Sequence, residues 1–101
     1  FIPDSMRIFE EEILSQLPDH YTSQQALIKD IAKVHGELLF IHPFREGNGR
    51  TSRILANLMA RKQGYPGLNF KRIDFNEYII AVQQVARKDY SRMEQIIAYT
   101  F

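Results

Sequence analysis

A twelve-residue stretch in the middle of the chain combines residue types that suit chemistry on a phosphate group. It holds a histidine, a carboxylate, a glycine-containing turn and, directly after that turn, two of its three arginines, namely His42, Glu46, Gly47, Asn48, Gly49, Arg50 and Arg53. The turn precedes a predicted helix, so consecutive backbone N–H groups can point at one anion. Arg50 and Arg53 are three residues apart and therefore share one face of that helix. Two guanidinium groups beside such N–H groups suit a polyphosphate better than a single carboxylate.

The histidine and the glutamate supply two further functions that phosphate transfer requires. His42 stands where the loop begins, and histidine is the side chain best suited to exchange a proton near neutral pH. Glu46 adds one carboxylate, and a lone carboxylate beside phosphate oxygens commonly holds Mg²⁺, with water completing the octahedron. Each of these features alone is usually structural. Their conjunction predicts transfer chemistry on a nucleotide phosphate.

Positive charge is concentrated around this stretch. Residues 1–38 contain three Lys/Arg and seven Asp/Glu, whereas residues 39–64 contain five Lys/Arg and one Glu. Arg50 and Arg53 would oppose the dipole of their helix unless an anion is bound there. The net charge of the whole chain is only +1, which is not that of a protein with a broad basic surface for nucleic acid. The local excess therefore predicts an anionic ligand and no nucleic-acid partner.

Length and composition are those of one globular domain. The 101 residues are 45% hydrophobic and 25% charged, which is ordinary for such a domain. No apolar run approaches the ~18 residues of a membrane helix, so no membrane partner is expected. The chain has no cysteine, which fits a reducing, cytoplasmic location, with a secreted effector as the alternative. Because the sequence opens at Phe1 in mid-pattern, residues 1–101 are expected to be a single domain that is incomplete at its N-terminus.

Hydrophobic periodicity and capping signals predict an all-α domain of about five helices. Gly64, followed by Pro66, is the expected stop of the third helix. The first helix is expected from Asp4 to Pro18, and the second from a Thr22–Gln25 capping box to His42, which precedes Pro43. The third is expected from Asn48 or Gly49 to about Gln63. The fourth is expected from an Asp74–Glu77 cap to about Ala86, and the fifth from a Ser91–Glu94 box through Tyr99.

The second of these helices is expected to be central and largely buried. Its apolar residues recur at spacings of four and three, and others widen the same face: Leu27, Ile31, Val34, Leu38 and Ile41, with Ile28, Ala32 and Leu39. His35 lies two turns before His42 on a similar face, and we interpret it as a packing or orienting residue, not a second base. Phe70 and Tyr78 are candidates for the wall of an adenine pocket, although nothing in the sequence selects them from the other aromatic residues.

The stretch His42-x-Phe44-x-Glu46-Gly47-Asn48-Gly49-Arg50-x-x-Arg53 resembles the complete signature of the Fic-domain family, and no position departs from the pattern. The likeness covers roughly residues 22–101. It implies a compact helical Fic-type core with a β-hairpin flap that normally positions the target peptide. The flap would be largely missing upstream of residue 1, with Phe1-Ile2-Pro3 as its end.

The resemblance also implies an activity and a role for each residue of the motif. The family's activity is protein adenylyltransfer (AMPylation), in which AMP moves from ATP, with Mg²⁺, onto a Ser, Thr or Tyr hydroxyl of a target protein. The substitutions of the Gly-Asn-Gly segment that mark the phosphorylating subgroup are absent. The implied roles are His42 as general base, Phe44 as core anchor, Glu46 as Mg²⁺ ligand, Gly47, Asn48 and Gly49 as anion hole, and Arg50 and Arg53 as ligands of the β- and γ-phosphates.

Two other classes of function remain open. The same scaffold could transfer UMP or phosphocholine, or remove AMP, because the surface that recognises the base lies outside the motif. A non-catalytic nucleotide-binding interaction module is the second class, and the intact His42 argues against it because binding alone needs no base.

Regulation follows from a further property of the family. Many members are inhibited by a helix with a Ser/Thr-x-x-x-Glu element, whose glutamate pairs with the second arginine of the motif. None of the seven glutamates of this chain has Ser or Thr four residues earlier. An inhibitor is therefore expected on an upstream segment or on a separate partner chain.

Overall fold

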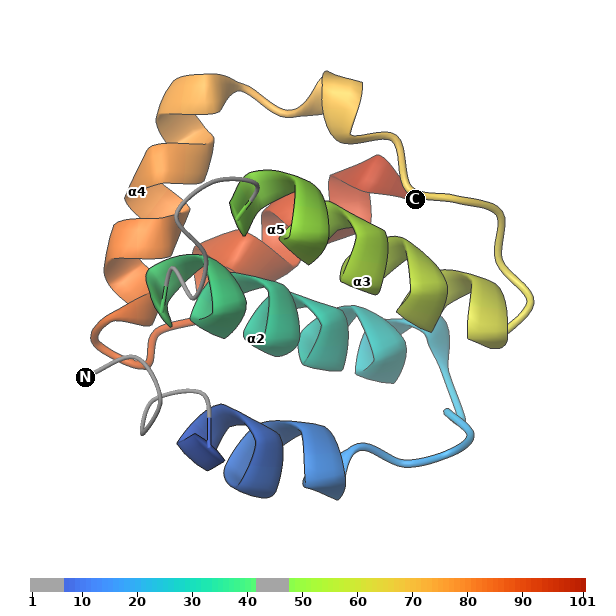
Figure 1. Cartoon of the computed structure of the whole chain (residues 1–101). Helices are drawn as coiled ribbons and strands as arrows, with labels where there is room; N and C mark the ends of the chain where they lie inside the picture. Colours follow the sequence, from blue (N-terminus) through green and yellow to red (C-terminus); the bar gives the residue numbers. More distant parts are fainter. Residues whose placement is uncertain (1–6, 42–47) are drawn as a thin grey trace.

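The computed structural model describes residues 7–41 and 48–101, and every regular element in that part is a helix (Figure 1). This confirms the prediction of a helical core with about five helices. None of the described helices combines the length and the apolarity needed to cross a membrane. The elements are η1 (Phe9–Ile13), η2 (Leu14–Gln16), α2 (Gln24–Ile41), α3 (Asn48–Lys62), η3 (Phe70–Arg72), α4 (Phe75–Val85) and α5 (Ser91–Thr100).

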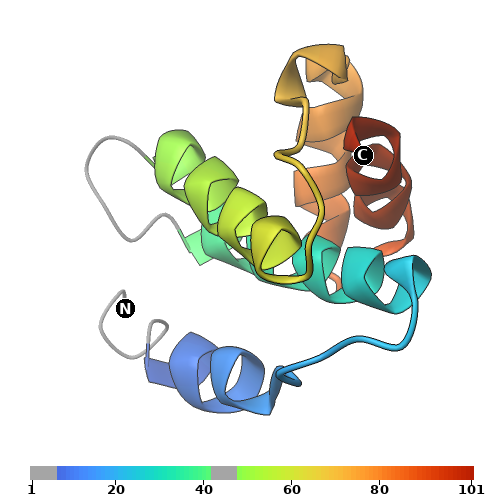
Figure 2. The same cartoon turned by 90° about the vertical axis from the view of Figure 1, so that its right-hand side faces the viewer.

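Helix α2 lies at the centre of the fold, as its apolar face predicts. It contacts α3, α4 and α5, and η1 packs against it from the remaining side (Figures 1 and 2). Ile31 and Ala32 of α2 are fully buried with residues of these partners, including Ala60, Val85 and Ile97. Helices α2 and α3 run antiparallel, side by side, so the end of α2 and the start of α3 lie at the same end of the molecule (Figure 1). The hydrophobic core thus holds the two helices that flank the candidate loop.

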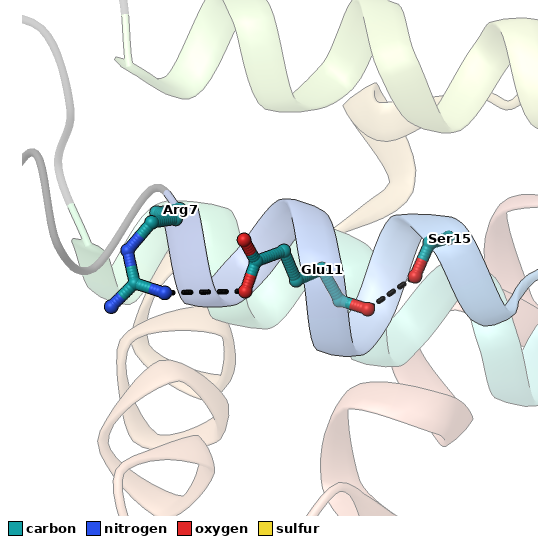
Figure 3. A network of polar contacts seen from close by, with 3 residues as sticks. All are labelled: Arg7, Glu11 and Ser15. Carbon is teal, nitrogen blue, oxygen red and sulfur yellow. Dashed lines mark hydrogen bonds and ion pairs between the residues drawn. The ribbon is translucent and has the colours of Figure 1, made fainter.

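The N-terminal segment differs from the regular α-helix that its apolar stripe predicts. A π-helical turn over Phe9–Ile13 is followed by a 3₁₀ turn over Leu14–Gln16, and the expected start at Asp4 lies outside the described residues. The Ser15 hydroxyl donates to the carbonyl of Glu11, four residues earlier (Figure 3), a bond that serine commonly forms within helical turns. The Arg7–Glu11 ion pair, at 3.2 Å, is exposed and contributes little stability. Phe9 is buried with Val34 and Leu38, so the stripe still faces α2.

Of the three predicted helix caps, the one at α4 agrees with the structure, and those at α2 and α5 do not. The Asp74 carboxylate accepts a hydrogen bond from the Glu77 N–H at 3.0 Å, as predicted. Helix α2 is capped by Ser23, whose hydroxyl accepts from the Ala26 N–H at 3.1 Å, so the predicted box at Thr22 is one residue too early. At α5 the predicted box is also wrong. Ser91 is already the first helical residue, and its N–H donates to the carboxylate of Asp89 at 3.1 Å.

The end of α3 agrees with the sequence. Gly64 has a φ of 89°, a conformation that favours glycine, and its N–H donates to the carbonyl of Arg61 at 3.0 Å. The chain then leaves the helix and returns through η3 to α4, which brings Phe70 and Tyr78 toward the start of α3.

Gly36 allows α2 and α4 to approach closely, and we predict that Gly36→Ala destabilises the fold. A Cβ at this position would lie 2.7 Å from Cγ2 of Val85, well inside van der Waals contact. Alanine normally favours a helix over glycine, but overpacking of this kind costs about 1–3 kcal/mol. Urea unfolding should show the loss, whereas Lys33→Ala, at an exposed position of the same helix, should change little. A Gly36→Ala variant as stable as the parent would show that the helices separate at no cost.

Candidate functional site

The described part of the candidate site is the first two turns of α3. Helix α3 begins at Asn48 and carries Gly49, Arg50 and Arg53. The first amides of a helix have no hydrogen-bond partner within it, and their N–H groups point outward at its N-terminal end. His42, Phe44, Glu46 and Gly47 lie outside the described residues, as does the side chain of Asn48. The structure therefore places the arginines and Gly49 of the predicted set, and leaves the positions of the base and the metal ligand as predictions.

Arg53 lies back along its helix over Gly49. A Cβ added to Gly49 would be 3.1 Å from Nη1 of Arg53, so the small residue leaves room for the guanidinium. Arg50 and Arg53 are both exposed. In residues 7–41 and 48–101, neither arginine pairs with a carboxylate. Two cations at a helix N-terminus without an acidic partner are suited to bind an anion.

A pocket of about 180 Å³ adjoins Arg53. Its remaining walls are apolar or aromatic and come from η3, α4 and the segment between them, namely Phe70, Ile73, Phe75 and Tyr78. Phe75 is 70% exposed, which is high for a large aromatic side chain and leaves its ring available to a ligand. The tertiary structure thus brings the two aromatic candidates, Phe70 and Tyr78, together with the second arginine of the motif. The sequence placed Phe75 on the apolar side of its helix, with Tyr78 and Ile79, and gave no sign that it lines this pocket.

His35 lies behind this pocket and is 1% exposed. Its Nδ1–H donates to the carbonyl of Ser52 at 3.0 Å, and the Tyr78 hydroxyl is hydrogen-bonded to Nε2. The ring also stacks on Phe70, with centroids 5.4 Å apart. Burial lowers the pKa of His35 to about 4, and the nearby Arg53 cation acts in the same direction. A neutral imidazole with both nitrogens engaged agrees with the orienting role predicted from sequence.

The burial of His35 predicts a pH-dependent stability. In the unfolded chain the pKa of His35 returns to 6.5. Between pH 6.5 and pH 4 the unfolded state therefore binds a proton at His35 that the folded state does not bind. The free energy of unfolding should therefore fall as the pH is lowered from 6.5 to 4, by up to about 3 kcal/mol from this residue. Urea titrations at several pH values measure this slope. His35→Asn, which cannot titrate, should remove it, and an equal slope in both proteins would contradict the assignment.

A buried acidic residue went unnoticed in the sequence. Glu37 is 4% exposed and its Oε1 accepts from Lys88 Nζ at 2.7 Å and from the Tyr90 hydroxyl at 2.5 Å. Lys88 has a φ of 61°, which is uncommon for a lysine. The signal was available, because Glu37 interrupts the apolar face of α2 between Val34 and Leu38. These contacts tie α2 to the link between α4 and α5.

Within the part of the chain that the structure describes, no group of three or more acidic or histidine side chains could hold a metal ion.

Comparison with known proteins agrees with the motif. A model of the Fic/DOC family matches residues 2–60. The chain is 34% identical over 93 residues to "Protein adenylyltransferase Fic" of Aedes aegypti, covering 84% of the chain and 19% of that protein. It is 35% identical over 77 residues to the protein of the same name from Nematostella vectensis, covering 73% of the chain and 17% of that protein. With "Protein adenylyltransferase fic-1" of Caenorhabditis elegans it shares 39% over 56 residues, or 55% of the chain and 11% of that protein.

The chain therefore spans about a fifth or less of the length of these relatives. The family model nevertheless covers more than half of the chain and includes the whole motif from His42 to Arg53. With its helical core and its arginine-bearing helix N-terminus, this chain belongs to the Fic/DOC family.

Proposed function

We propose that residues 1–101 form the catalytic core of a protein adenylyltransferase that moves AMP from ATP, with Mg²⁺, onto a Ser, Thr or Tyr hydroxyl of a target protein. The observation that carries the proposal is the position of Arg53. The second arginine of an intact Fic motif lies beside the N-terminus of α3 and lines a pocket with an aromatic wall. Such a site offers cations and amide N–H groups to phosphates, and aromatic rings to a base.

The reaction would be an in-line substitution at the α-phosphorus. The target hydroxyl oxygen forms a bond to the α-phosphorus. At the same time the bond between the α-phosphorus and the oxygen that bridges it to the β-phosphate breaks, and pyrophosphate leaves with that oxygen. His42 would accept the hydroxyl proton as this bond forms. Gly47, Asn48 and Gly49 would bind phosphate oxygens through backbone N–H groups, and Arg50 and Arg53 would hold the β- and γ-phosphates.

Mg²⁺ fits the donors that the sequence offers. A single carboxylate, from Glu46, together with phosphate oxygens and water, is the usual way in which nucleotide enzymes hold this ion. When bound, the ion would neutralise charge on the phosphates. Phe44 would anchor the loop in the core.

The partners of the protein follow from this chemistry. A protein with an accessible hydroxyl is the substrate, and the relatives' names, protein adenylyltransferase, support a protein target. An inhibitory partner chain or an upstream inhibitory segment is the source of control that we propose. A carboxylate paired with Arg53 would occupy the place of the γ-phosphate oxygens and misalign ATP for attack. The cysteine-free sequence fits a cytoplasmic location, which we also propose.

Incubation of the full-length protein with labelled donors tests the activity. We expect label from [α-³²P]ATP, and not from γ-labelled ATP, to appear on the protein itself or on a target, because the bond that breaks leaves the α-phosphate on the product. UTP and CDP-choline, run in parallel, test the transfer of UMP and phosphocholine. Label from γ-labelled ATP would contradict AMP transfer, and binding of ATP without any labelled product would favour the non-catalytic module.

A further inference from the structure

His35 connects the two sides of the candidate site through one buried ring. Its Nδ1 faces the carbonyl of Ser52 on α3 at 3.0 Å, and its Nε2 meets the hydroxyl of Tyr78 on α4. The imidazole also stacks on Phe70 and Tyr78, with centroid distances of 5.4 and 5.7 Å. Since His35 itself belongs to the central helix α2, this ring is in contact with three elements at once.

The donor and acceptor roles of this ring are fixed by its partners. A carbonyl oxygen can only accept, so Nδ1 carries the proton that is donated to Ser52. In the neutral ring Nε2 is then an acceptor, and the Tyr78 hydroxyl donates to it. Burial favours the neutral ring and lowers the pKa of His35 to about 4. At neutral pH a single pattern of hydrogen bonds therefore holds Ser52 and Tyr78 relative to α2.

Both partners of His35 belong to the parts that would contact a nucleotide. Ser52 directly precedes Arg53, so a bond to its carbonyl holds the turn from which that guanidinium extends. Tyr78 and Phe70 line the pocket with Arg53. The Ser52 side chain does not share this task, because its buried hydroxyl has no hydrogen-bond partner among the described residues. Among the described residues, the hydrogen bond that links this turn of α3 to α2 is thus the one between the imidazole and the Ser52 carbonyl.

We propose that His35 is a positioning residue that acts through its hydrogen bond to the carbonyl of Ser52. This bond sets the distance between Arg53 and the aromatic wall, and with that distance the site binds a nucleoside triphosphate in preference to a monophosphate. The inference rests on the proposed function, in which Arg53 binds the terminal phosphate. A displacement of this turn would reduce the contact with that phosphate. It would leave the aromatic wall, which both nucleotides share, in place.

Two substitutions separate the bonds of His35. In His35→Asn the side-chain amide nitrogen stands near the position of Nδ1 and can still donate to Ser52. In His35→Gln the amide reaches the position of Nε2, so the bond to Ser52 is lost while Tyr78 keeps a partner. Each variant of the full-length protein would be titrated with ATP and with AMP by calorimetry at pH 7.5, and its thermal unfolding would be recorded alongside.

The expected result is a change in the ratio of the two affinities. His35→Gln should lower the preference for ATP over AMP by about 2- to 12-fold, the range for one lost hydrogen bond, whereas His35→Asn should keep most of the preference. If His35 served only to stabilise the fold, both variants would be less thermally stable and the ratio of ATP to AMP affinity would not change. That result would overturn the inference. Equal losses of preference in both variants would overturn it too.

Tyr78→Phe provides a test that does not depend on the folding of the glutamine variant. It keeps the ring in the core and removes only the hydroxyl that orients the imidazole, so a partial loss of ATP preference is expected. If that variant folds with an unchanged ratio while His35→Gln is insoluble, the inference is overturned. A parent protein that binds ATP and AMP equally would overturn the role of Arg53 and this inference together. A clear preference in the parent, with no change in any variant, would overturn the inference alone.

Discussion

Replacement of His42 by alanine is expected to abolish AMP transfer while ATP still binds with an affinity within a few fold of the parent. The imidazole is proposed to act on the proton of the target hydroxyl and not on the phosphates. Loss of a general base typically lowers the rate by about 10²- to 10⁴-fold. Binding energy from the amides and the arginines of α3 should be retained. Single-turnover transfer from labelled ATP measures the rate, and calorimetry measures the affinity.

His20→Ala is the matched control for this experiment. His20 is exposed and lies in the segment between η2 and α2, so its removal should leave both the rate and the affinity as they are. A His42→Ala protein that modifies its target at nearly the parental rate would refute the base mechanism. A protein that instead loses ATP affinity would show that His42 contacts the nucleotide.

Arg53→Ala is expected to weaken binding of ATP far more than binding of AMP. The second arginine is assigned to the terminal phosphate, which AMP lacks. A charge-assisted hydrogen bond of this kind contributes about 1.5–3 kcal/mol, so ATP affinity should fall by roughly 10- to 150-fold. The affinity for AMP should fall little, because its single phosphate is assigned to the other groups. Calorimetric titration with both nucleotides in the presence of Mg²⁺ measures the two losses.

Arg61→Ala controls for the general loss of positive charge. Arg61 is exposed in the last turn of the same helix, and it lies at the end remote from the motif. We expect its removal to lower both affinities only slightly, through weaker long-range attraction. Equal losses for ATP and AMP in Arg53→Ala would contradict the assignment of this arginine to the γ-phosphate.

Local signals predicted most of the helices because each depends on neighbouring residues. The apolar spacing in α2, the Asp74 cap and the Gly64 stop each act within a turn or two. The displaced cap at Ser23, and the Asp89 carboxylate that accepts from the first N–H of α5, show the limit of such signals. Several polar residues next to each helix start can accept from the same N–H groups, and the path of the incoming chain decides which one does.

The N-terminal segment was harder to predict for a related reason. Its apolar residues correctly indicated a face against α2, and Phe9 is buried there. The periodicity did not distinguish an α-helix from a π-helical turn followed by a 3₁₀ turn, because all three present their side chains along similar stripes over so short a length.

The sequence by itself determined the family, the helical class and the identity of the chemically active stretch, since the motif from His42 to Arg53 is contiguous. Only the tertiary structure decided which distant residues surround that stretch. Phe70, Phe75 and Tyr78 join Arg53 because α2 packs against both α3 and α4. The two hydrogen-bond partners of His35 lie 17 and 43 residues away in the sequence. Contacts at such separations leave no local periodicity, and they form only when burial of the central helix brings its neighbours together.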